Sequence, residues 1–411
     1  MRVLMILPYT PTLVRTRSFN FLKGLVQAGV EVTLATVWEN DEEREQLSSW
    51  TAQGVDVISA QLTRLDKLGN LAFALPTRLP LQARYCWQPR LASQIGEVLG
   101  RRAYDIVHIE HLRGAEYGLY AKAILQLRNV RLPMVWDSVD CISLLFEQAA
   151  VTSRSIFGRW ITRFELGRTK RYERRMVGTF AQTLVTSQSD REALVTMAGQ
   201  ERIQECVTVL KNGVDLEYFS KSDLPKAKDL VIFSGKMSYH ANLHAAMVLV
   251  KEIMPIVWMK KPHIRVQLVG KDPPYELRKL ALDDSRVEVT GTVPNLAVYL
   301  QNATIAVAPV MYGVGIQNKI LEAMACGTPV ITSRQGVSAL DTVAGRDLLT
   351  AGTAEEFARK IIETLDNAAL LAELGENGRL FVEKHHQWKD IIKELLKIYG
   401  RGRNSQPSSR A

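Results

Sequence analysis

Cysteines are few in this chain, and their spacing fits no metal site. The 411 residues include 4 cysteines and no Cys-x-x-Cys pair; the four are Cys86, Cys141, Cys206 and Cys326. This scatter argues against a zinc site and indicates reduced thiols in a cytosolic compartment. We therefore expect no bound metal and a cytoplasmic protein.

Long hydrophobic runs are also missing. The apolar part of the N-terminal stretch MRVLMILPYTP is too short for a signal peptide or a membrane-spanning helix. We find no other stretch that is apolar over a sufficient length. We therefore expect a protein that is soluble or lies on a membrane surface.

The N-terminal region lacks the Gly-x-Gly-x-x-Gly turn of dinucleotide-binding domains. Arg2 to Leu7 reads as a buried strand, Arg17 to Ala28 as a helix, and Val30 to Val37 as the next strand. This order predicts a Rossmann-like βαβ unit, but the missing glycines weaken a dinucleotide-binding interpretation. Arg17 is either a ligand contact or an ordinary arginine of the first helical turn.

Size and charge set broader limits. A chain of 411 residues with 46% hydrophobic and 23% charged residues predicts a folded protein of two domains. The formal charge of +9 favours anionic partners such as nucleotides, acidic polysaccharide, nucleic acid or an anionic membrane face.

The most informative stretch is 312–332, with the sequence YGVGIQNKILEAMACGTPVIT. It predicts a glycine turn, a helix from Gln317 to Cys326 and a buried strand. Helical spacing places Gly315, Lys319 and Glu322 on one face beside the helix N-terminus. That end attracts phosphate, and Glu322 can accept hydrogen bonds from sugar hydroxyls. The alternative is a surface helix with one solvated Lys–Glu pair.

Polar residues follow two further predicted strands. Asp105 to Ile109 runs into Glu110 and His111, and Asp137 lies at the end of another strand. Strand ends in parallel sheets face the crevice where ligands bind, so these side chains are candidates for catalysis. We expect His108, inside the first strand, to be a packed core residue.

A basic amphipathic helix is predicted from Ser153 to Met176. Its arginines and lysines interleave with apolar residues at helical spacing: Ile156, Phe157, Trp160, Ile161 and Phe164. Such a helix can lie in the headgroup region of an anionic membrane. It can equally pack its apolar side on the domain and leave its basic face in solvent. No nucleic-acid-binding motif accompanies it, so we expect no nucleic acid partner.

Several motifs resemble, in order, those of family four glycosyltransferases, which have the GT-B fold. They are Asn212-Gly213-Val214-Asp215, Gly235-Lys236, and Glu322 followed by Ala323-Met324-Ala325-Cys326-Gly327-Thr328-Pro329-Val330. The resemblance covers most of the chain. It implies an α/β protein of two Rossmann-like domains with a deep interdomain cleft. The implied parts are 1–217, a linker at 218–229, a donor-binding domain at 230–384, a crossover helix at 385–400 and a disordered tail at 401–411.

The resemblance also implies roles for individual residues. Donor binding would involve Arg17, Asn212, Gly235, Lys236, Gly313, Val314, Gly315, Ile316, Lys319 and Glu322, and the catalytic side would involve Glu110, His111 and Asp137. The chain departs from the family pattern in two places. Val314 stands where many members have a glutamate that contacts the transferred sugar, and Ala241 replaces a second basic residue. The phosphate site would then rest on Lys236, Lys319 and backbone amides.

The implied activity is that of a retaining glycosyltransferase of the hexosyltransferase type. It would move a sugar from a UDP- or GDP-linked donor to a carbohydrate, lipid-linked or small-molecule acceptor, in the synthesis of surface polysaccharide or glycoconjugate. The donor is a substrate, and no cofactor or metal is expected, since no Asp-x-Asp pair occurs. Two alternatives stay open: a GT-B sugar-nucleotide epimerase, and a non-catalytic module that binds a membrane surface. We expect the protein in the cytoplasm, or peripheral on the inner face of the cytoplasmic membrane.

Overall fold

The computed structural model describes residues 1–152, 156–199, 201–222, 226–311 and 316–404, with side chains for these except 149–161, 201–203, 403 and 404. The predicted contacts at Gly313, Val314 and Gly315 lie outside the described residues. The chain divides into two compact units, Met1–Lys211 with Trp388–Ala411, and Asn212–Gln387.

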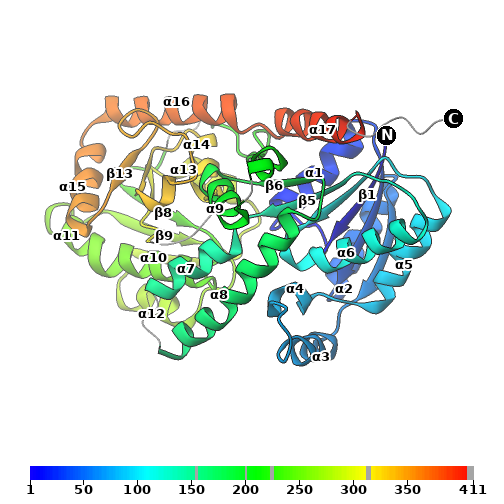
Figure 1. Cartoon of the computed structure of the whole chain (residues 1–411). Coiled ribbons are helices and arrows are strands. Elements are labelled where there is room, and N and C mark those ends of the chain that lie inside the picture. Colours follow the sequence, from blue (N-terminus) through cyan, green and yellow to red (C-terminus); the bar gives the residue numbers. More distant parts are fainter. Residues whose placement is uncertain (153–155, 200, 223–225, 312–315, 405–411) are drawn as a thin grey trace. The chain divides into compact units, whose positions relative to one another are not determined.

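A seven-stranded parallel sheet forms the centre of the first unit, in the order β3-β2-β1-β4-β5-β6-β7 (Figure 1). The strands are β1 (Arg2–Leu7), β2 (Glu31–Trp38), β3 (Asp56–Gln61), β4 (Ile106–Glu110), β5 (Met134–Val139), β6 (Gln182–Val185) and β7 (Val207–Val209). The helices are α1 (Thr16–Gln27), α2 (Asp41–Ala52), α3 (Arg64–Ala74), α4 (Leu81–Tyr85), α5 (Pro89–Arg101), α6 (His111–Leu127), α7 (Ile142–Thr152), α8 (Ile156–Val177), α9 (Gln188–Ala198) and α17 (Trp388–Asn404).

Both faces of this sheet are covered, as parallel sheets require. Alternate residues of β1 enter two separate cores, because successive side chains of a strand point to opposite faces. Val3, Met5 and Leu7 pack with α1 and α17, and Leu4 and Ile6 pack with α5 and α6. The C-terminal helix α17 is therefore part of the first unit's core.

The second unit has a six-stranded parallel sheet in the order β10-β9-β8-β11-β12-β13. Its strands are β8 (Leu230–Ser234), β9 (Arg265–Val269), β10 (Val287–Gly291), β11 (Ile305–Ala308), β12 (Val330–Ser333) and β13 (Leu349–Ala351). Its helices are α10 (His240–Val248), α11 (Met254–Lys260), α12 (Tyr275–Asp283), α13 (Leu296–Asn302), α14 (Asn318–Ala325), α15 (Ala354–Leu365) and α16 (Ala368–His385).

The chain passes between the units after Lys211 and again after Gln387. The predicted linker at 218–229 therefore lies within the second unit. In that unit the backbone N–H of Val214 donates to the carbonyl of His386 at 2.7 Å, and Val214 forms an isolated bridge with Gln387. These contacts hold the two connecting segments together on the second unit's side.

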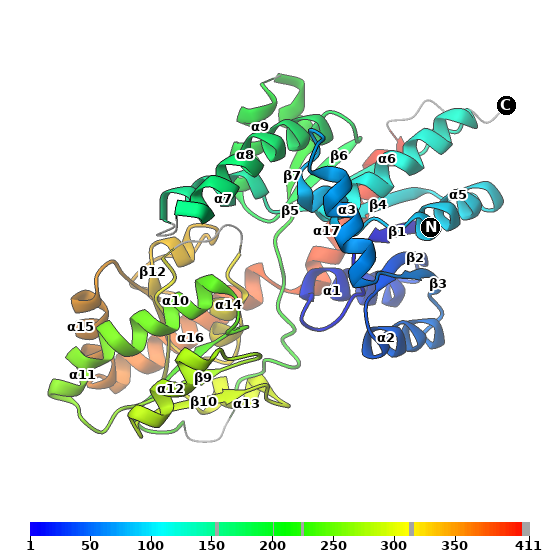
Figure 2. The ribbon, with the colours of Figure 1, turned by 90° about the horizontal axis from the view of Figure 1, so that it is seen from below.

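One helix corrects the expectation that no stretch is long and apolar enough to cross a membrane. The segment His240–Lys260 meets that test with a mean hydropathy of 1.2, and α10 and α11 continue through a π-helical segment at Leu249–Ile253 (Figure 2). Half of the most apolar 18-residue part of this segment is buried inside the protein. Its side chains, among them Ala245 and Met254, belong to the core of the second unit. Burial against the sheet explains the apolar composition.

The two sheets share one topological feature. In each, the strand order reverses about its first strand, between β1 and β4 in the first unit and between β8 and β11 in the second. In open α/β sheets, ligands bind outside the carboxyl ends of the strands at such a switch point. This rule directs attention to Glu110 at the end of β4 and to Gly235 directly after β8.

Candidate active site

In the second unit, three elements converge after β8. Gly235 has a φ of 150°, and a Cβ there would lie 2.8 Å from Asn242 Nδ2 and 3.4 Å from Lys319 Cε. The Asn242 side chain donates to the carbonyl of Lys236 at 2.9 Å. The Gly235–Lys236 turn, α10 and α14 therefore meet at the carboxyl end of β8, and the absence of a side chain at Gly235 makes this approach possible.

Lys319 and Glu322 form the charged part of this region. Burial lowers the pKa of Lys319 to about 8, partly offset by the Glu322 carboxylate. Burial raises the pKa of Glu322 to about 7, opposed by Lys319. Lys319 donates to Gln317 Oε1 at 3.0 Å. Half-buried ionisable groups with shifted pKa values are typical of functional sites.

Two helices begin beside these cations without a side-chain cap. The N-caps of α10 and α14 are Tyr239 and Gln317, and neither side chain accepts a hydrogen bond from its helix. Uncapped N-terminal amides attract anions. Lys236 adds an exposed ammonium group 3.9 Å from Asp272 Oδ2. The arrangement suits a diphosphate.

The other residues predicted for donor binding lie elsewhere. Ile316 is half-buried and packs on the core of the second unit. The carbonyl of Asn212 lies 2.7 Å from His386 Nδ1, which must be the donor in this bond because a carbonyl can only accept. Arg17 belongs to the first unit and is nearly fully buried. The roles of these residues toward a donor stay predictions.

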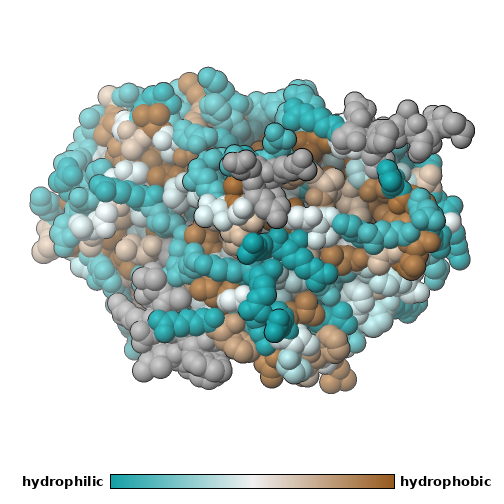
Figure 3. Space-filling view, viewed as in Figure 1, coloured by the Kyte–Doolittle hydropathy of each residue, from teal (hydrophilic) through white to brown (hydrophobic). Residues whose placement is uncertain are grey.

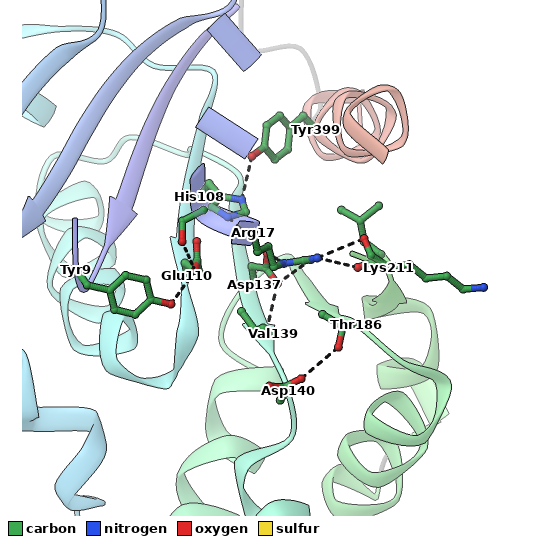
Figure 4. A network of polar contacts seen from close by, with 12 residues as sticks. Tyr9, Arg17, His108, Glu110, Asp137, Val139, Asp140, Thr186, Lys211 and Tyr399 are labelled. Atoms are coloured by element: carbon green, nitrogen blue, oxygen red, sulfur yellow. Dashed lines mark hydrogen bonds and ion pairs between the residues drawn. The ribbon is translucent and has the colours of Figure 1, made fainter. Parts of the chain in front are cut away.

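In the first unit, Arg17 at the start of α1 contacts Asp137 on β5 (Figure 4). Arg17 Nε lies 2.7 Å from Asp137 Oδ2, and Nη2 lies 3.1 Å from Oδ1. Arg17 also donates to the carbonyl of Leu210 at 3.0 Å. Asp137 is fully buried. In this conformation the carboxylate orients Arg17 and the end of β7, so we regard Asp137 as a positioning residue.

Glu110 points inward from the end of β4. Its Oε1 accepts from the hydroxyl group of Tyr9 at 2.8 Å (Figure 4). The same oxygen accepts from the hydroxyl group of Ser18 at 2.9 Å. Its Oε2 is buried and has no hydrogen-bond partner among the described residues. Burial, reinforced by the nearby Asp137 charge, raises the pKa of Glu110 to about 7. The carboxyl group is therefore able to hold a proton near neutral pH.

His111 follows directly, in the left-handed region with a φ of 64°. It is half-buried, and burial, aided by the charge of Arg113, lowers its pKa to about 3. The backbone N–H of Arg113 donates to His111 Nδ1 at 3.3 Å, which leaves the proton of the neutral ring on Nε2. Of Glu110 and His111, His111 is the more accessible to a ligand.

The prediction that His108 is a packed core residue is confirmed. It is fully buried, and the Tyr399 hydroxyl of α17 lies 2.9 Å from His108 Nδ1. The contacts of Tyr9, Ser18 and Tyr399 were missed from the sequence, because all three depend on packing between segments far apart in the chain. The contact of Asn242 with the Lys236 carbonyl was missed as well.

Two protein-family models match the chain. Glycosyl transferases group 1 matches residues 228–367, and Glycosyltransferase Family 4 matches residues 14–218. Together they span both units.

Curated relatives give matches of different extent. A D-inositol 3-phosphate glycosyltransferase of Gordonia bronchialis is 23% identical over 408 residues, covering 93% of this chain and 82% of the relative. An MMP alpha-(1->4)-mannosyltransferase of Mycolicibacterium hassiacum is 33% identical over 147 residues, covering 33% of this chain and 35% of the relative. A D-inositol 3-phosphate glycosyltransferase of Nocardiopsis dassonvillei is 27% identical over 223 residues, covering 47% of this chain and 50% of the relative. The chain thus matches only a third to a half of the length of the latter two.

Solved structures match over nearly the whole chain. Sucrose-phosphate synthase of Thermosynechococcus elongatus has a TM-score of 0.70 at 17% identity, covering 98% of this chain and 99% of that one. HepE of Anabaena in complex with UDP has a TM-score of 0.67 at 14% identity, covering 98% and 100%. At such identities the likeness shows the fold. With the family models and the ordered motifs, these matches establish that the chain belongs to the group 1, family 4 glycosyltransferases and has the GT-B fold.

Proposed function

We propose that this protein transfers a sugar from a nucleotide-diphosphate sugar to an acceptor hydroxyl with retention of anomeric configuration, and that the donor binds at the carboxyl end of β8 in the second unit. The observation that carries the proposal is the meeting of Lys319, Gly235–Lys236 and two uncapped helix N-termini. Few small ligands other than a diphosphate match so many donors and cations in one place.

The chemistry follows from the charges. As the bond between the sugar and the diphosphate breaks, negative charge grows on the leaving phosphate. Lys236, Lys319 and the first-turn amides of α10 and α14 stabilise that charge in a fixed arrangement, and electrostatic stabilisation of this kind usually contributes most to the rate acceleration by an enzyme. Glu322, ionised above its pKa of about 7, accepts hydrogen bonds from the ribose hydroxyls.

In the first unit, His111 is the proposed ligand contact. Its neutral ring carries a proton on Nε2 and can donate a hydrogen bond to a sugar hydroxyl. Glu110 and Asp137 act through Tyr9, Ser18 and Arg17. The acceptor class, and a role in surface polysaccharide or glycoconjugate synthesis, are proposals that rest on the family resemblance.

A donor screen tests the proposal. HepE of Anabaena has been solved with UDP-glucose, so UDP-sugars are the first donors to try and GDP-sugars the second. The protein is incubated with UDP- and GDP-hexoses and candidate acceptors, and products are identified by mass spectrometry and NMR. We expect free nucleoside diphosphate and a glycoside of unchanged anomeric configuration. An isomerised sugar nucleotide would identify an epimerase, and unchanged donor throughout would contradict the proposal.

A further inference from the structure

Helix α3 (Arg64–Ala74) turns its apolar side to solvent. Leu65 is 78% exposed, Leu68 63% and Phe73 56%, and Leu75, the residue after the helix, is 55% exposed. Of the helix residues, Ala74 is buried. A helix that packs on a soluble protein normally has the opposite arrangement, with its apolar face on the core.

The polar side of α3 holds the helix in this orientation. Asp66 closes a capping box at the helix start. Lys67 pairs with Glu39, and Asn70 Nδ2 donates to the carbonyl of Trp87 at 2.7 Å. Directed hydrogen bonds and an ion pair therefore fix α3 to the unit. Leu65 and Leu68 contribute little to folding and stay available for a partner.

We call Leu65, Leu68 and Leu75 the α3 apolar stripe; Phe73 lies on another face of the helix, where the Arg84 guanidinium lies 4.8 Å above its ring. Positions 65, 68, 72 and 75 follow the three- and four-residue spacing of one helix face, and residue 72 is alanine. Figure 3 shows hydrophobic atoms at the lower edge of the surface, where Figure 1 places α3. The described part of the chain has 18 exposed large hydrophobic residues, and four of them fall between positions 65 and 75. Such a concentration marks an interaction site.

Positive charge surrounds the stripe. Arg64 and Arg78 are exposed at its two ends. At the C-terminus of α3, Arg168 of α8 donates to the carbonyl of Leu75 at 2.7 Å. This guanidinium is mostly buried and lies 3.7 Å from Glu165, so the exposed charge of the rim comes from Arg64 and Arg78. The acidic residues close by, Asp66 and Glu39, are engaged in the capping box and with Lys67. An apolar face with a basic rim matches the surface of an anionic lipid bilayer.

We propose that the α3 apolar stripe inserts into the surface of an anionic membrane and holds the enzyme there. This differs from one of the two alternatives that the sequence left open, in which the helix from Ser153 to Met176 makes the contact. In the described part of α8, Tyr172, Met176 and Val177 are buried in the first unit, and the exposed Arg171, Arg174 and Arg175 supply charge only. The proposal concerns where the enzyme acts and goes beyond the transfer reaction itself.

Vesicle flotation of the full chain tests it. Vesicles of phosphatidylcholine with phosphatidylglycerol are compared with pure phosphatidylcholine. We expect the wild type to float with the anionic vesicles, and Leu65→Gln with Leu68→Gln to lower the partition coefficient by at least about tenfold, since each leucine loses the free energy of burial in lipid. The matched control is Leu127→Gln with Leu282→Gln, which removes leucines that are 81% and 84% exposed elsewhere. This control should bind like the wild type.

A fluorescent label reports insertion directly. Cys206 is the half-exposed cysteine among the four, so Leu68→Cys is made in a Cys206→Ser background and labelled with the dye NBD. Anionic vesicles should shift NBD emission to shorter wavelength, and the same label at Leu127→Cys should not respond. Binding of UDP in each variant should be unchanged, which separates failure of this proposal from failure of the donor site.

Three results would overturn the proposal. The first is wild-type protein that does not float with anionic vesicles at low salt. The second is flotation lost with Arg171→Glu and Arg174→Glu but retained in the leucine variant, which would assign the contact to α8 charge alone. The third is a wild-type dimer that dissociates in the Leu65→Gln, Leu68→Gln variant, which would make a second copy of the chain the partner of the stripe.

Discussion

Arg17 and Asp137 lie 120 positions apart and form a buried ion pair with two hydrogen bonds of 2.7 and 3.1 Å. The pair joins the start of α1 to the end of β5, and Arg17 continues to the carbonyl of Leu210 at the end of the first unit's sheet. Two fully desolvated charges in this geometry are costly to separate.

Arg17→Met should therefore destabilise the first unit by about 3–5 kcal/mol, because it leaves the Asp137 carboxylate buried without a counter-charge. The measurement is the urea midpoint of the first unit's unfolding transition. Adding Asp137→Asn should recover most of the loss, since a neutral amide needs no cation. The matched surface control is Arg2→Met, which breaks the exposed pair with Glu31 and should cost under about 1 kcal/mol. If Arg2→Met and Arg17→Met lowered the free energy of unfolding equally, the buried pair would have no special importance for stability.

Glu110 should make stability depend on pH near neutrality. Its folded pKa of about 7 lies above the usual value of 4.5, so the folded state binds the proton more tightly and loses stability as pH rises toward 7. Glu110→Gln should reduce the slope of unfolding free energy between about pH 5 and 7, the interval between the usual and the folded pKa, by up to about 1.4 kcal/mol per pH unit. The pKa values of Asp140 and Glu173 are also raised to about 7, so part of the pH dependence should remain in the variant. Identical slopes in mutant and wild type would contradict this.

Gly270 should be essential for the shape of the donor site. It has a φ of 150°, and a Cβ there would lie 1.9 Å from the carbonyl oxygen of Gly235. Gly270→Ala should displace the Gly235–Lys236 turn, destabilise the second unit by about 2–4 kcal/mol and weaken UDP binding. Gly291→Ala is the control at the end of the neighbouring strand, with a φ of 72° and nothing within 4 Å of a Cβ. It should lose only about 1–2 kcal/mol and keep UDP affinity.

Transfer activity should survive chelation. The proposed diphosphate site consists of lysines and backbone amides, so no step needs a divalent ion to neutralise the leaving group. Turnover is measured before and after dialysis against EDTA, with a magnesium add-back. Complete loss of turnover that magnesium restores would contradict this assignment.

The sequence predicted the elements that have strong local signals. The strand at Arg2–Leu7 was predicted with its observed bounds. Helix α14 was predicted within one residue at each end, since Gly327 terminates it with a φ of 66°. In α1, however, the sequence pattern did not single out Phe21, which is fully buried in the first unit.

Pairwise contacts in the sites were the part that local pattern could not supply. The partner of Arg17 lies on β5, and the partners of Glu110 lie on α1 and in the loop after β1. Only strand order brings these together. The outward leucines of α3 escaped notice because their spacing is that of an ordinary buried face, and only burial shows which way the helix turns.

The most direct test of the donor site is calorimetric titration of UDP, and of GDP if UDP does not bind, into the wild type, Glu322→Ala and Lys319→Ala. Glu322→Ala loses charge-assisted hydrogen bonds of roughly 1.5–3 kcal/mol each, so the account predicts binding weaker by about one to two orders of magnitude. Lys319→Ala should weaken binding as well and, in the transfer assay, also lower kcat. Melting temperatures should match the wild type, since both side chains are only half-buried. Wild-type nucleotide affinity in both folded variants would contradict the account.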